Sequence, residues 1–573
     1  MTHKTNTLRT WMLALGFTMA LCVVVFGFGL VHTLIDDVVV MRALSGFSGE
    51  YPRFLPFMHG MIVLPLAWLH QQIPSIHWYS WFLTGCFYGS FAIILKCLLQ
   101  RCSKARKGQA ILALLAFFVL LLLGFALEIS FTNVSTLLGC AALAQLLSFD
   151  ARNASARQMF LATLLAFGLA ALAYGLRMEN IYPILGFCGL GALLQMFRLH
   201  QAGCLRQKQG RHFLTFLLIP IVGLALLMGW RVWECSLPEN REIDAWNQAR
   251  IPVTDFLGMK QLPDSLLEEL GWTRVEAEAF ENWFFLDSSV DTQAFEKIEE
   301  YQRSELQKQG LWKRIAASQQ TFWRFFGEHP AVLIAVGLMG CCAAGIFLGE
   351  CKEKKWLALV SLVASYLLLS VLAFRGRFLM RAVLAVMAPE MTYLLMLNAD
   401  EPCARFRHLL CKCLSYVLLA GMIVAGFLVR ADQLNFEWSF SPLRSYRYRN
   451  SWSLIDEYAA QNPEALFVVD TMADDRLFPD MLEGRATNVL YFGGWQVRDS
   501  EFESQLRRFG IDPKNMDGTL FLQDNVCLVS LSTEYAGWIQ AYVQSLCDHP
   551  VTAKTLATFK ENYWAKVIQF HLE

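Results

Sequence analysis

Ile35-Asp36-Asp37-Val38-Val39-Val40-Met41-Arg42 follows an apolar segment that runs from about residue 11 to residue 35. Two adjacent carboxylates at the edge of a membrane are costly, so ionisable residues in such a place indicate a function. A simpler reading is that they cap a helix beginning at Val38, because aspartate is favoured at a helix N-terminus. A cap needs only one acid, and the two roles are compatible. The stretch therefore predicts a membrane helix that ends at a functional acidic loop.

The chain as a whole is too apolar for a soluble protein of its length. It has 573 residues, of which 55% are hydrophobic and only 17% charged, and its mean hydropathy is +0.37. Apolar runs long enough to cross a hydrocarbon core of about 30 Å recur along it. We expect roughly eleven membrane-spanning helices, at residues 11–23, 78–99, 110–127, 134–149, 158–176, 181–197, 213–233, 330–349, 355–374, 378–397 and 413–429.

Charge and cysteine content exclude several classes of partner. The net charge is zero and no basic tract stands out in a polar segment, so nucleic acid is not expected as a partner. Most of the 16 cysteines lie in or beside apolar runs, where they pack as small side chains, so no disulfide framework is implied. Cys411 and Cys413 lack a second pair at the spacing of a zinc site.

Positive charge sets the expected orientation, because short loops rich in lysine and arginine stay in the cytoplasm. Placing four such loops and the N-terminus inside fixes every span; these loops are residues 101–107, 198–211, 352–355 and 405–412. The outer segments are then residues 31–77, 128–133, 177–180, 234–329, 375–377 and 430–573. This solution requires that the apolar stretch at 54–70, which holds Pro56 and Pro65, lies in the outer interface without crossing.

The expected fold class is an α-helical polytopic membrane protein with a small extracytoplasmic α/β domain at its C-terminus. Its parts are a seven-helix core at residues 1–233 with a first outer loop at 36–77, a helical outer loop at 234–329, four further membrane helices at 330–430, and the outer domain at 431–573. Within that domain, helical segments separate three buried strands, expected at Leu466-Phe-Val-Val-Asp470, Asn488-Val-Leu-Tyr-Phe492 and Asn525-Val-Cys-Leu-Val-Ser530.

Acids and arginines collect at the expected outer boundary, whereas the cytoplasmic loops carry mostly simple basic clusters. The boundary residues are Asp36, Asp37, Arg42, Glu50, Arg53, Glu128, Arg177, Glu179, Arg375, Arg377 and Arg381. Two neighbouring carboxylates hold a proton partly bound, which suits a general base or a metal site. The common side of these residues therefore resembles the face of an active site.

Three arginines stand out in this set. Arg377 and Arg381 are four residues apart and share a helical face, and Gly376 lets Arg375 turn toward them. Their guanidinium groups would clamp a phosphate or pyrophosphate on a lipid carrier. The alternative is that they reach toward lipid phosphates in general.

The supporting residues have two readings each. Arg177 and Glu179 form either an internal ion pair or substrate contacts. Glu128 is either a carboxylate that faces the site or a solvated helix end. His59, in the interfacial stretch, is either structural or catalytic.

The pattern resembles the GT-C superfamily of membrane glycosyltransferases, which use polyprenyl-phosphate sugars. In that superfamily the first helix leads into an outer loop with an acidic motif, which corresponds here to Ile35-Asp36-Asp37. Juxtamembrane helices, seven core spans, a large outer loop, further spans and an outer C-terminal domain then follow, as they do here. Arg375-Gly-Arg-Phe-Leu-Met-Arg381, with Pro389 beyond it, looks like the arginine-rich stretch of uncharacterised bacterial members. Ser45-Gly46 and Tyr51-Pro52 complete a similar first-loop signature.

The resemblance implies a mechanism and a set of partners. A sugar on a polyprenyl phosphate would enter from the outer leaflet, and Asp36 or Asp37 would accept the proton of an acceptor hydroxyl, inverting the anomeric centre. The carrier phosphate would be held by Arg375, Arg377, Arg381, Arg42 and Arg53. The acceptor would be a glycolipid, a cell-wall polymer or a protein.

The resemblance also implies a bacterial inner-membrane protein with a cytoplasmic N-terminus. A divalent cation could bridge Asp37 and Glu128, and the implied mechanism needs no covalent enzyme intermediate. Two other functions compete: a transporter or flippase of lipid-linked glycans, and an O-antigen-type ligase or polymerase. A transporter would be expected to carry charges at mid-membrane and to show repeated halves.

Overall fold

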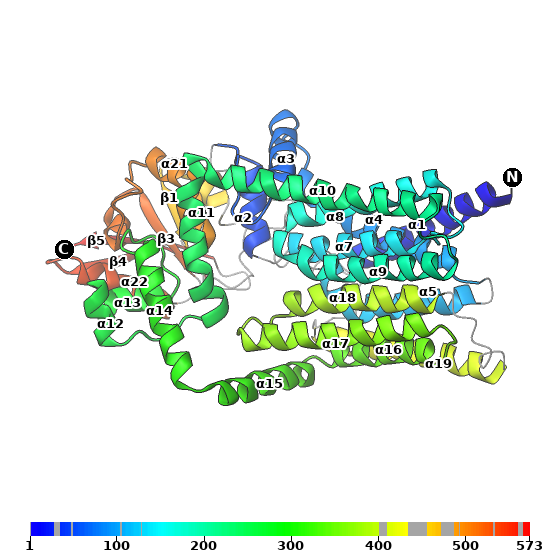
Figure 1. The fold of residues 1–573 in the computed structure, drawn as a ribbon. Helices are drawn as coiled ribbons and strands as arrows, with labels where there is room; N and C mark the ends of the chain where they lie inside the picture. The colour runs from blue at the N-terminus through cyan, green and yellow to red at the C-terminus, as the bar shows by residue number, and fades with distance from the viewer. Residues whose placement is uncertain are drawn as a thin grey trace.

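A bundle of membrane-spanning helices carries a soluble region at one end (Figure 1). The computed structural model describes residues 2–27, 35–46, 50–103, 106–127, 129–399, 409–433, 455, 457–470, 486–491, 493–530, 533–559 and 565–573. Within those ranges, nine helices are long and apolar enough to cross a membrane, and two shorter apolar helices, Phe131–Leu147 and Ser415–Val429, accompany them. These helices correspond to the spans expected from sequence, and the predicted fold class is confirmed.

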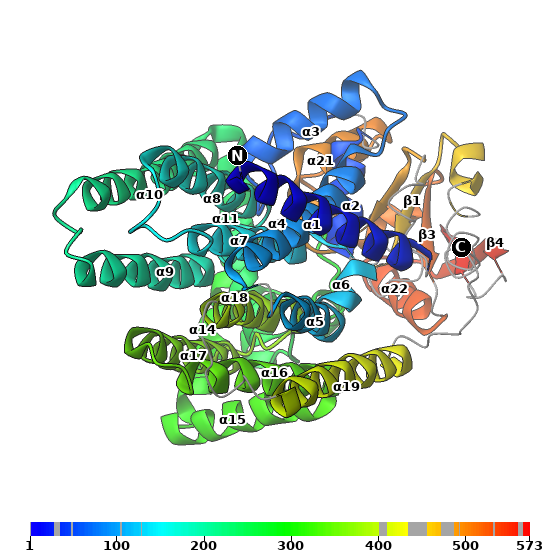
Figure 2. The ribbon, with the colours of Figure 1, turned by 90° about the vertical axis from the view of Figure 1, so that its right-hand side faces the viewer.

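The bundle is built around α7 (Phe131–Leu147), all of whose residues are buried. Figure 2 shows this helix surrounded by its neighbours, and it packs against α4, α8, α9 and α18. The other membrane helices are α1 (Thr2–Gly27), α4 (Trp78–Arg101), α5 (Lys107–Phe117), which continues through η2 (Phe118–Leu122) into α6 (Leu123–Leu127), α8 (Ala156–Leu176), α9 (Ile181–Gln201), α10 (Lys208–Ser236), α16 (Pro330–Phe347), α17 (Lys352–Phe374), α18 (Met380–Asn398) and α19 (Leu409–Gln433).

Two short helices, α2 (Ile35–Leu44) and α3 (Gly60–Gln72), lie where the bundle meets the soluble region (Figure 1). A helix needs about 20 residues to cross a membrane, and α3 has 13. The expectation that the stretch 54–70 does not span is therefore confirmed. Its first residues are not helical, because α3 begins only at Gly60, where the side chain of His59 accepts a hydrogen bond from the N–H of Met61.

The segment between α10 and α16 is helical, as the sequence predicts. It comprises α11 (Pro238–Ile251), the π-helical turn η4 (Pro252–Leu257), α12 (Asp264–Leu270), α13 (Arg274–Glu281), α14 (Thr292–Lys308) and α15 (Leu311–Glu328). The first helices of this segment gather beside the C-terminal region, whereas α15 returns to the bundle beside α17 (Figure 1).

The C-terminal region holds a five-stranded sheet with the order β2-β1-β3-β5-β4. The three strands expected from sequence are β1 (Leu466–Val469), β2 (Val489–Tyr491) and β3 (Val526–Ser530), which pair in parallel, while α21 (Ser500–Arg508) and α22 (Thr533–Ser545) follow the expected helical periodicity. The antiparallel hairpin of β4 (Val551–Phe559) and β5 (Ala565–Leu572) was not expected. Most of β4 is exposed, so it lacks the apolar alternation that marks a strand in sequence.

The two faces of this sheet are buried against different partners. Successive side chains of a strand point to opposite faces. Phe467 and Val469 of β1 join the core of the bundle, whereas Leu466 and Val468 join a second core together with residues of α11 to α14, such as Trp246. The helical segment after α10 and the C-terminal sheet thus share one core. The sheet is held over the end of the bundle at which α2 lies.

Candidate active site

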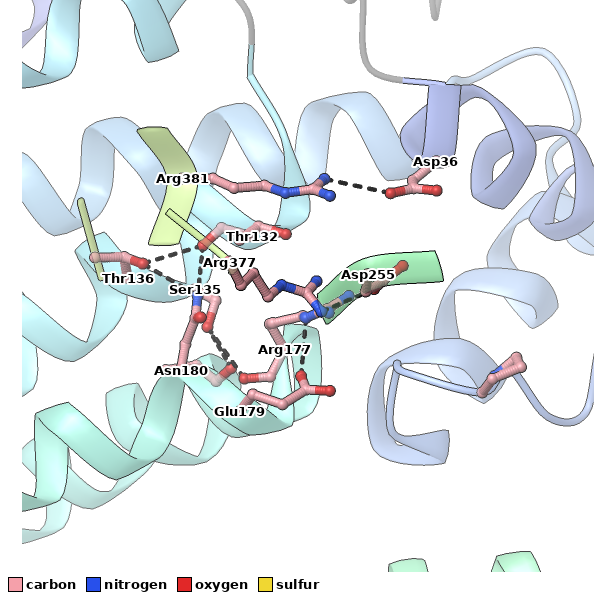
Figure 3. Close-up of polar contacts among 12 residues, drawn as sticks. Asp36, Thr132, Ser135, Thr136, Arg177, Glu179, Asn180, Asp255, Arg377 and Arg381 are labelled. Atoms are coloured by element: carbon pink, nitrogen blue, oxygen red, sulfur yellow. Dashed lines mark hydrogen bonds and ion pairs between the residues drawn. The ribbon is translucent and has the colours of Figure 1, made fainter. Parts of the chain in front are cut away.

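Asp36, at the start of α2, lies between the membrane helices and the C-terminal region. Its Oδ2 is 3.4 Å from Nη1 of Arg381 on α18 (Figure 3), and its Oδ1 accepts a hydrogen bond of 3.2 Å from Nε1 of Trp495. The side chain of Asp36 is 31% exposed. One carboxylate is therefore held by groups from two distant parts of the chain and remains accessible.

Asp37 has a different environment, because it is buried beneath its neighbour. Its Oδ1 accepts hydrogen bonds from the hydroxyl of Tyr79, at 2.8 Å, and from the N–H of Phe131, at 2.9 Å. Its Oδ2 is buried without a hydrogen-bond partner among the described residues. Burial raises the pKa of Asp37 to about 8, although the two hydrogen bonds act in the opposite direction. At neutral pH the protonated form therefore prevails.

The arginines between α17 and α18 depend on Gly376. Its φ is +82°, and a Cβ at this position would overlap the carbonyl oxygen of Phe256. Only glycine tolerates both the left-handed backbone and this close approach. The turn places Nη1 of Arg377 2.8 Å from Oδ2 of Asp255 (Figure 3). The guanidinium of Arg377 also lies over the ring of Phe256 at 5.1 Å.

Asp255 is flanked by a second arginine, Arg250, which is not expected from the sequence. Nη1 of Arg250 lies 3.6 Å from Oδ1 of Asp255 and donates to Oγ1 of Thr254 at 2.9 Å. Burial alone would raise the pKa of Asp255, but the charges of Arg250 and Arg377 outweigh it, and the net pKa is lowered. Asp255 is therefore an ionised carboxylate between two guanidinium groups.

Arg177 and Glu179 form an ion pair of 2.8 Å, the first of the two readings that their sequence allowed (Figure 3). The guanidinium of Arg177 also lies over the rings of Phe57, at 5.2 Å, and Phe131, at 5.7 Å. Its positive charge acts on Asp255 as well. We define the Asp–Arg cluster as Asp36, Asp37, Asp255, Arg177, Arg250, Arg377 and Arg381.

Several residues expected at the site lie elsewhere. Arg42 donates to the carbonyl oxygens of Ala486, at 2.8 Å, and Val489, at 3.2 Å, so it fastens α2 to the C-terminal sheet. Arg53 and Arg375 are exposed, and within the part of the chain that the structure describes neither side chain has a hydrogen bond or ion pair to the cluster.

His59 is accounted for by the local structure. Its Nδ1 accepts from the N–H of Met61, and its Nε2 lies 3.0 Å from the carbonyl oxygen of Leu227, so the neutral tautomer with a proton on Nε2 satisfies both contacts. The ring is fully buried. This arrangement fits the structural reading of His59.

The possible cation bridge between Asp37 and Glu128 lies outside the described residues, because Glu128 is not among them. Among the residues that are described, no group of three or more His, Cys, Asp and Glu side chains is arranged to hold a metal ion.

Asp255, Arg250 and Trp495 are site residues that the sequence does not predict. The first two are five residues apart, a spacing that does not bring side chains together on an α-helix. The π-helical turn η4, with its i to i+5 bonding, permits their contact. The one local signal for Trp495 is the pair Gly493-Gly494 before it, because two adjacent glycines favour a turn.

Comparison with known proteins gives limited similarity. No protein-family model and no curated protein matches the chain. Among solved structures it is similar to ArnT from Cupriavidus metallidurans in the apo state, with 11% identity and a TM-score of 0.41 over 97% of each chain. It is also similar to ArnT from Cupriavidus metallidurans bound to undecaprenyl phosphate, with 12% identity and a TM-score of 0.39 over 96% of this chain and 97% of that one. Similarity at these scores supports no argument about the site, whose chemistry depends on the residues of this chain alone.

Proposed function

We propose that this chain is a membrane glycosyltransferase that moves a sugar from a polyprenyl-phosphate carrier to an acceptor hydroxyl. The observation that carries the proposal is the 3.4 Å approach of Asp36 and Arg381. It joins a carboxylate that can accept a proton to a guanidinium that can bind a phosphate, at the end of a membrane bundle. Both groups are needed for transfer from a phosphate leaving group.

The arginines act on the carrier. Arg377 and Arg381 are one turn apart at the start of α18, so both can contact the phosphate of a lipid that approaches from the side of the bundle. As the bond between the anomeric carbon and the phosphate oxygen breaks, its electron pair leaves with the phosphate. Positive groups already in place stabilise that developing charge.

Asp36 acts on the acceptor. It accepts the hydroxyl proton while the acceptor oxygen attacks the anomeric carbon from the face opposite the phosphate, so the configuration at that carbon inverts. Asp36 suits this role better than Asp37, because it is accessible and paired with arginine. Asp37, protonated at neutral pH, instead binds Tyr79 and the first residue of α7. It anchors the start of α2 beneath the base.

The partners follow from this chemistry. The donor is a sugar linked to a polyprenyl phosphate, and the acceptor is a glycolipid, a cell-wall polymer or a protein. The protein lies in a bacterial inner membrane, with its N-terminus in the cytoplasm and the Asp–Arg cluster facing outward. The positive loops on the opposite side support this orientation.

Transfer can be tested with purified protein in proteoliposomes and a panel of radiolabelled donors, including both phosphate-linked and diphosphate-linked sugars. We expect transfer from a phosphate-linked donor, its loss in Asp36→Asn and Arg381→Ala, and normal activity in Arg303→Gln, whose side chain is exposed on α14. Transfer only from a diphosphate-linked donor would instead identify a ligase or polymerase. Movement of the lipid without release of sugar would identify a transporter.

A further inference from the structure

Among the described residues, hydrogen bonds join the C-terminal region to Asp36, Arg42 and Glu50 of the first loop. Besides the bond from Trp495 to Asp36, Arg42 donates to the carbonyl oxygens of Ala486 and of Val489, the first residue of β2, and Oγ of Ser504 lies 3.2 Å from Oε1 of Glu50. These contacts cover both ends of α2 and the residues after it. The position of α2, and with it the position of Asp36, is therefore coupled to the C-terminal sheet.

Trp495 is held firmly in place for this contact. It begins the short helical turn η7 (Trp495–Arg498), which follows Gly494, a glycine with φ of +80°. At the other end of η7, Arg498 donates to the carbonyl oxygen of Asp287 at 3.2 Å. The indole is only 4% exposed and meets the ring of Phe57 edge-on at 4.6 Å.

Phe57 links the indole to the rest of the cluster. Its ring stacks on Phe131 at 5.6 Å and lies beneath the guanidinium of Arg177. Phe131 also supplies the N–H that binds Asp37. Trp495 therefore packs on Phe57, a ring that also supports Arg177 and stacks on Phe131 beside Asp37.

The chemistry of the indole limits what it can do. Its Nε1–H is a donor only, so it cannot take a proton from Asp36 and is not itself an acid–base group at the site. It can hold Oδ1 of the carboxylate while Arg381 faces Oδ2, and two contacts on two oxygens fix the plane of the group. A carboxylate fixed in this way is preorganised to receive a proton from one direction.

We propose that Trp495 is a positioning residue for Asp36, and that the C-terminal domain is thereby part of the active site. The inference rests on the proposed function of Asp36 as general base. It goes beyond that function, because it assigns the C-terminal domain a direct role in the transfer step.

The test compares Trp495→Phe with Trp538→Phe in the full-length protein in proteoliposomes. Phenylalanine at 495 keeps a ring to pack on Phe57 but removes the N–H. Trp538 lies on α22, where its ring stacks on Tyr542 at 6.1 Å. Trp538→Phe therefore makes the same change of side chain at a position outside the cluster. Two quantities are measured: kcat and KM for transfer, and hydrogen exchange of the α2 amides, which requires no activity.

We expect kcat to fall about tenfold in Trp495→Phe, the effect of losing one hydrogen bond to a charged group. KM for the donor should stay unchanged, because the arginines are untouched. The α2 amides should exchange up to about tenfold faster, because the same hydrogen bond to a charged group is lost. Trp538→Phe should change none of these. Equal kcat values and equal α2 exchange in the two variants would overturn the inference.

The two proposals fail in different ways. If the unmodified protein transfers no sugar from any donor, the proposed function fails and the role assigned to Trp495 in transfer fails with it. If the unmodified protein is active and Trp495→Phe raises KM while leaving kcat unchanged, the function stands. Trp495 then contributes to binding, and its assignment as a positioning residue is wrong.

Discussion

Nη1 of Arg377 lies 2.8 Å from Oδ2 of Asp255, and this pair ties the turn between α17 and α18 to the π-helical turn η4. Both side chains are largely buried, at 15% and 23% exposure. The guanidinium is thus oriented before any lipid arrives. A phosphate at this site would share Arg377 with Asp255, so the acid sets both the direction and the strength of anion binding.

Replacing Asp255 with asparagine should therefore lower both the stability of the protein and its affinity for the lipid phosphate. Arg250, which is buried, would lose its acidic partner, and breaking a buried pair in this way costs about 3 kcal/mol. Arg377 would also lose its fixed direction. We expect a lower Tm in detergent for Asp255→Asn, and weaker binding of labelled undecaprenyl phosphate.

The matched control is Asp264→Asn, because Asp264 pairs with Arg274 while 87% exposed. Exposed pairs contribute at most about 1 kcal/mol, so this variant should resemble the unmodified protein in both measurements. Equal Tm values for the two variants would contradict the structural role of Asp255.

Asp37 predicts a specific pH dependence of stability. Its ordinary pKa of 3.8 applies to the unfolded chain, whereas its folded pKa is about 8. Between about pH 4 and pH 8 the folded state keeps a proton that the unfolded state has released, so this residue makes stability fall as pH rises. Asp37→Asn cannot titrate, and its amide oxygen can still accept the bonds from Tyr79 and Phe131.

The measurement is Tm as a function of pH from 5 to 8.5 for both proteins. The Tm of Asp37→Asn relative to that of the unmodified protein should rise steadily across this range, since only the unmodified protein loses stability through Asp37. A difference in Tm that does not change with pH would show that Asp37 is ionised in the folded state.

Much of this arrangement could be predicted from the sequence. The lengths of the apolar runs define the spans, and the basic loops assign their ends to two sides. These two constraints together place Asp36, Arg377 and Arg381 at one boundary, and the structure brings Asp36 and Arg381 into contact. The short stretch at 54–70 could be excluded as a span because a second crossing would have reversed every later loop.

The rest of the cluster depends on contacts that no local pattern encodes. Asp255 follows a polar helix and resembles any other acid on a solvated surface. Asp255 belongs to the cluster only because it pairs with Arg377, which lies on another element, and because the backbone approaches closely at Gly376. Trp495 likewise reaches Asp36 only because the sheet is docked over α2. Arg42 was expected at the site for its charge, but it binds the backbone of that same sheet.

The proposed orientation predicts opposite accessibility for two native cysteines. Cys204 lies in the connection between α9 and α10, and Cys547 follows α22 in the soluble region at the other end of the bundle (Figure 1). A membrane-impermeant maleimide added to intact spheroplasts should modify Cys547 and leave Cys204 unmodified, as read by peptide mass spectrometry. Permeabilisation should then expose Cys204. The reverse pattern would place the Asp–Arg cluster on the cytoplasmic side.

Gly376 offers a test of how closely the arginine turn must approach η4. Alanine at this position meets two obstacles: the left-handed backbone, and the carbonyl oxygen of Phe256. Gly271, with φ of +71° and open space around it, presents only the first obstacle. Alanine in a left-handed conformation costs about 1 kcal/mol, so Gly271→Ala measures the backbone cost alone.

We expect Gly376→Ala to lower Tm further than Gly271→Ala, because backbone atoms must move apart to admit the methyl group. That movement carries Arg377 away from Asp255, so binding of undecaprenyl phosphate and transfer should both fall in Gly376→Ala and remain normal in Gly271→Ala. If Gly376→Ala lost stability but kept full affinity and activity, the contact between Arg377 and Asp255 would not contribute to the site. The turn would then serve only to connect α17 to α18.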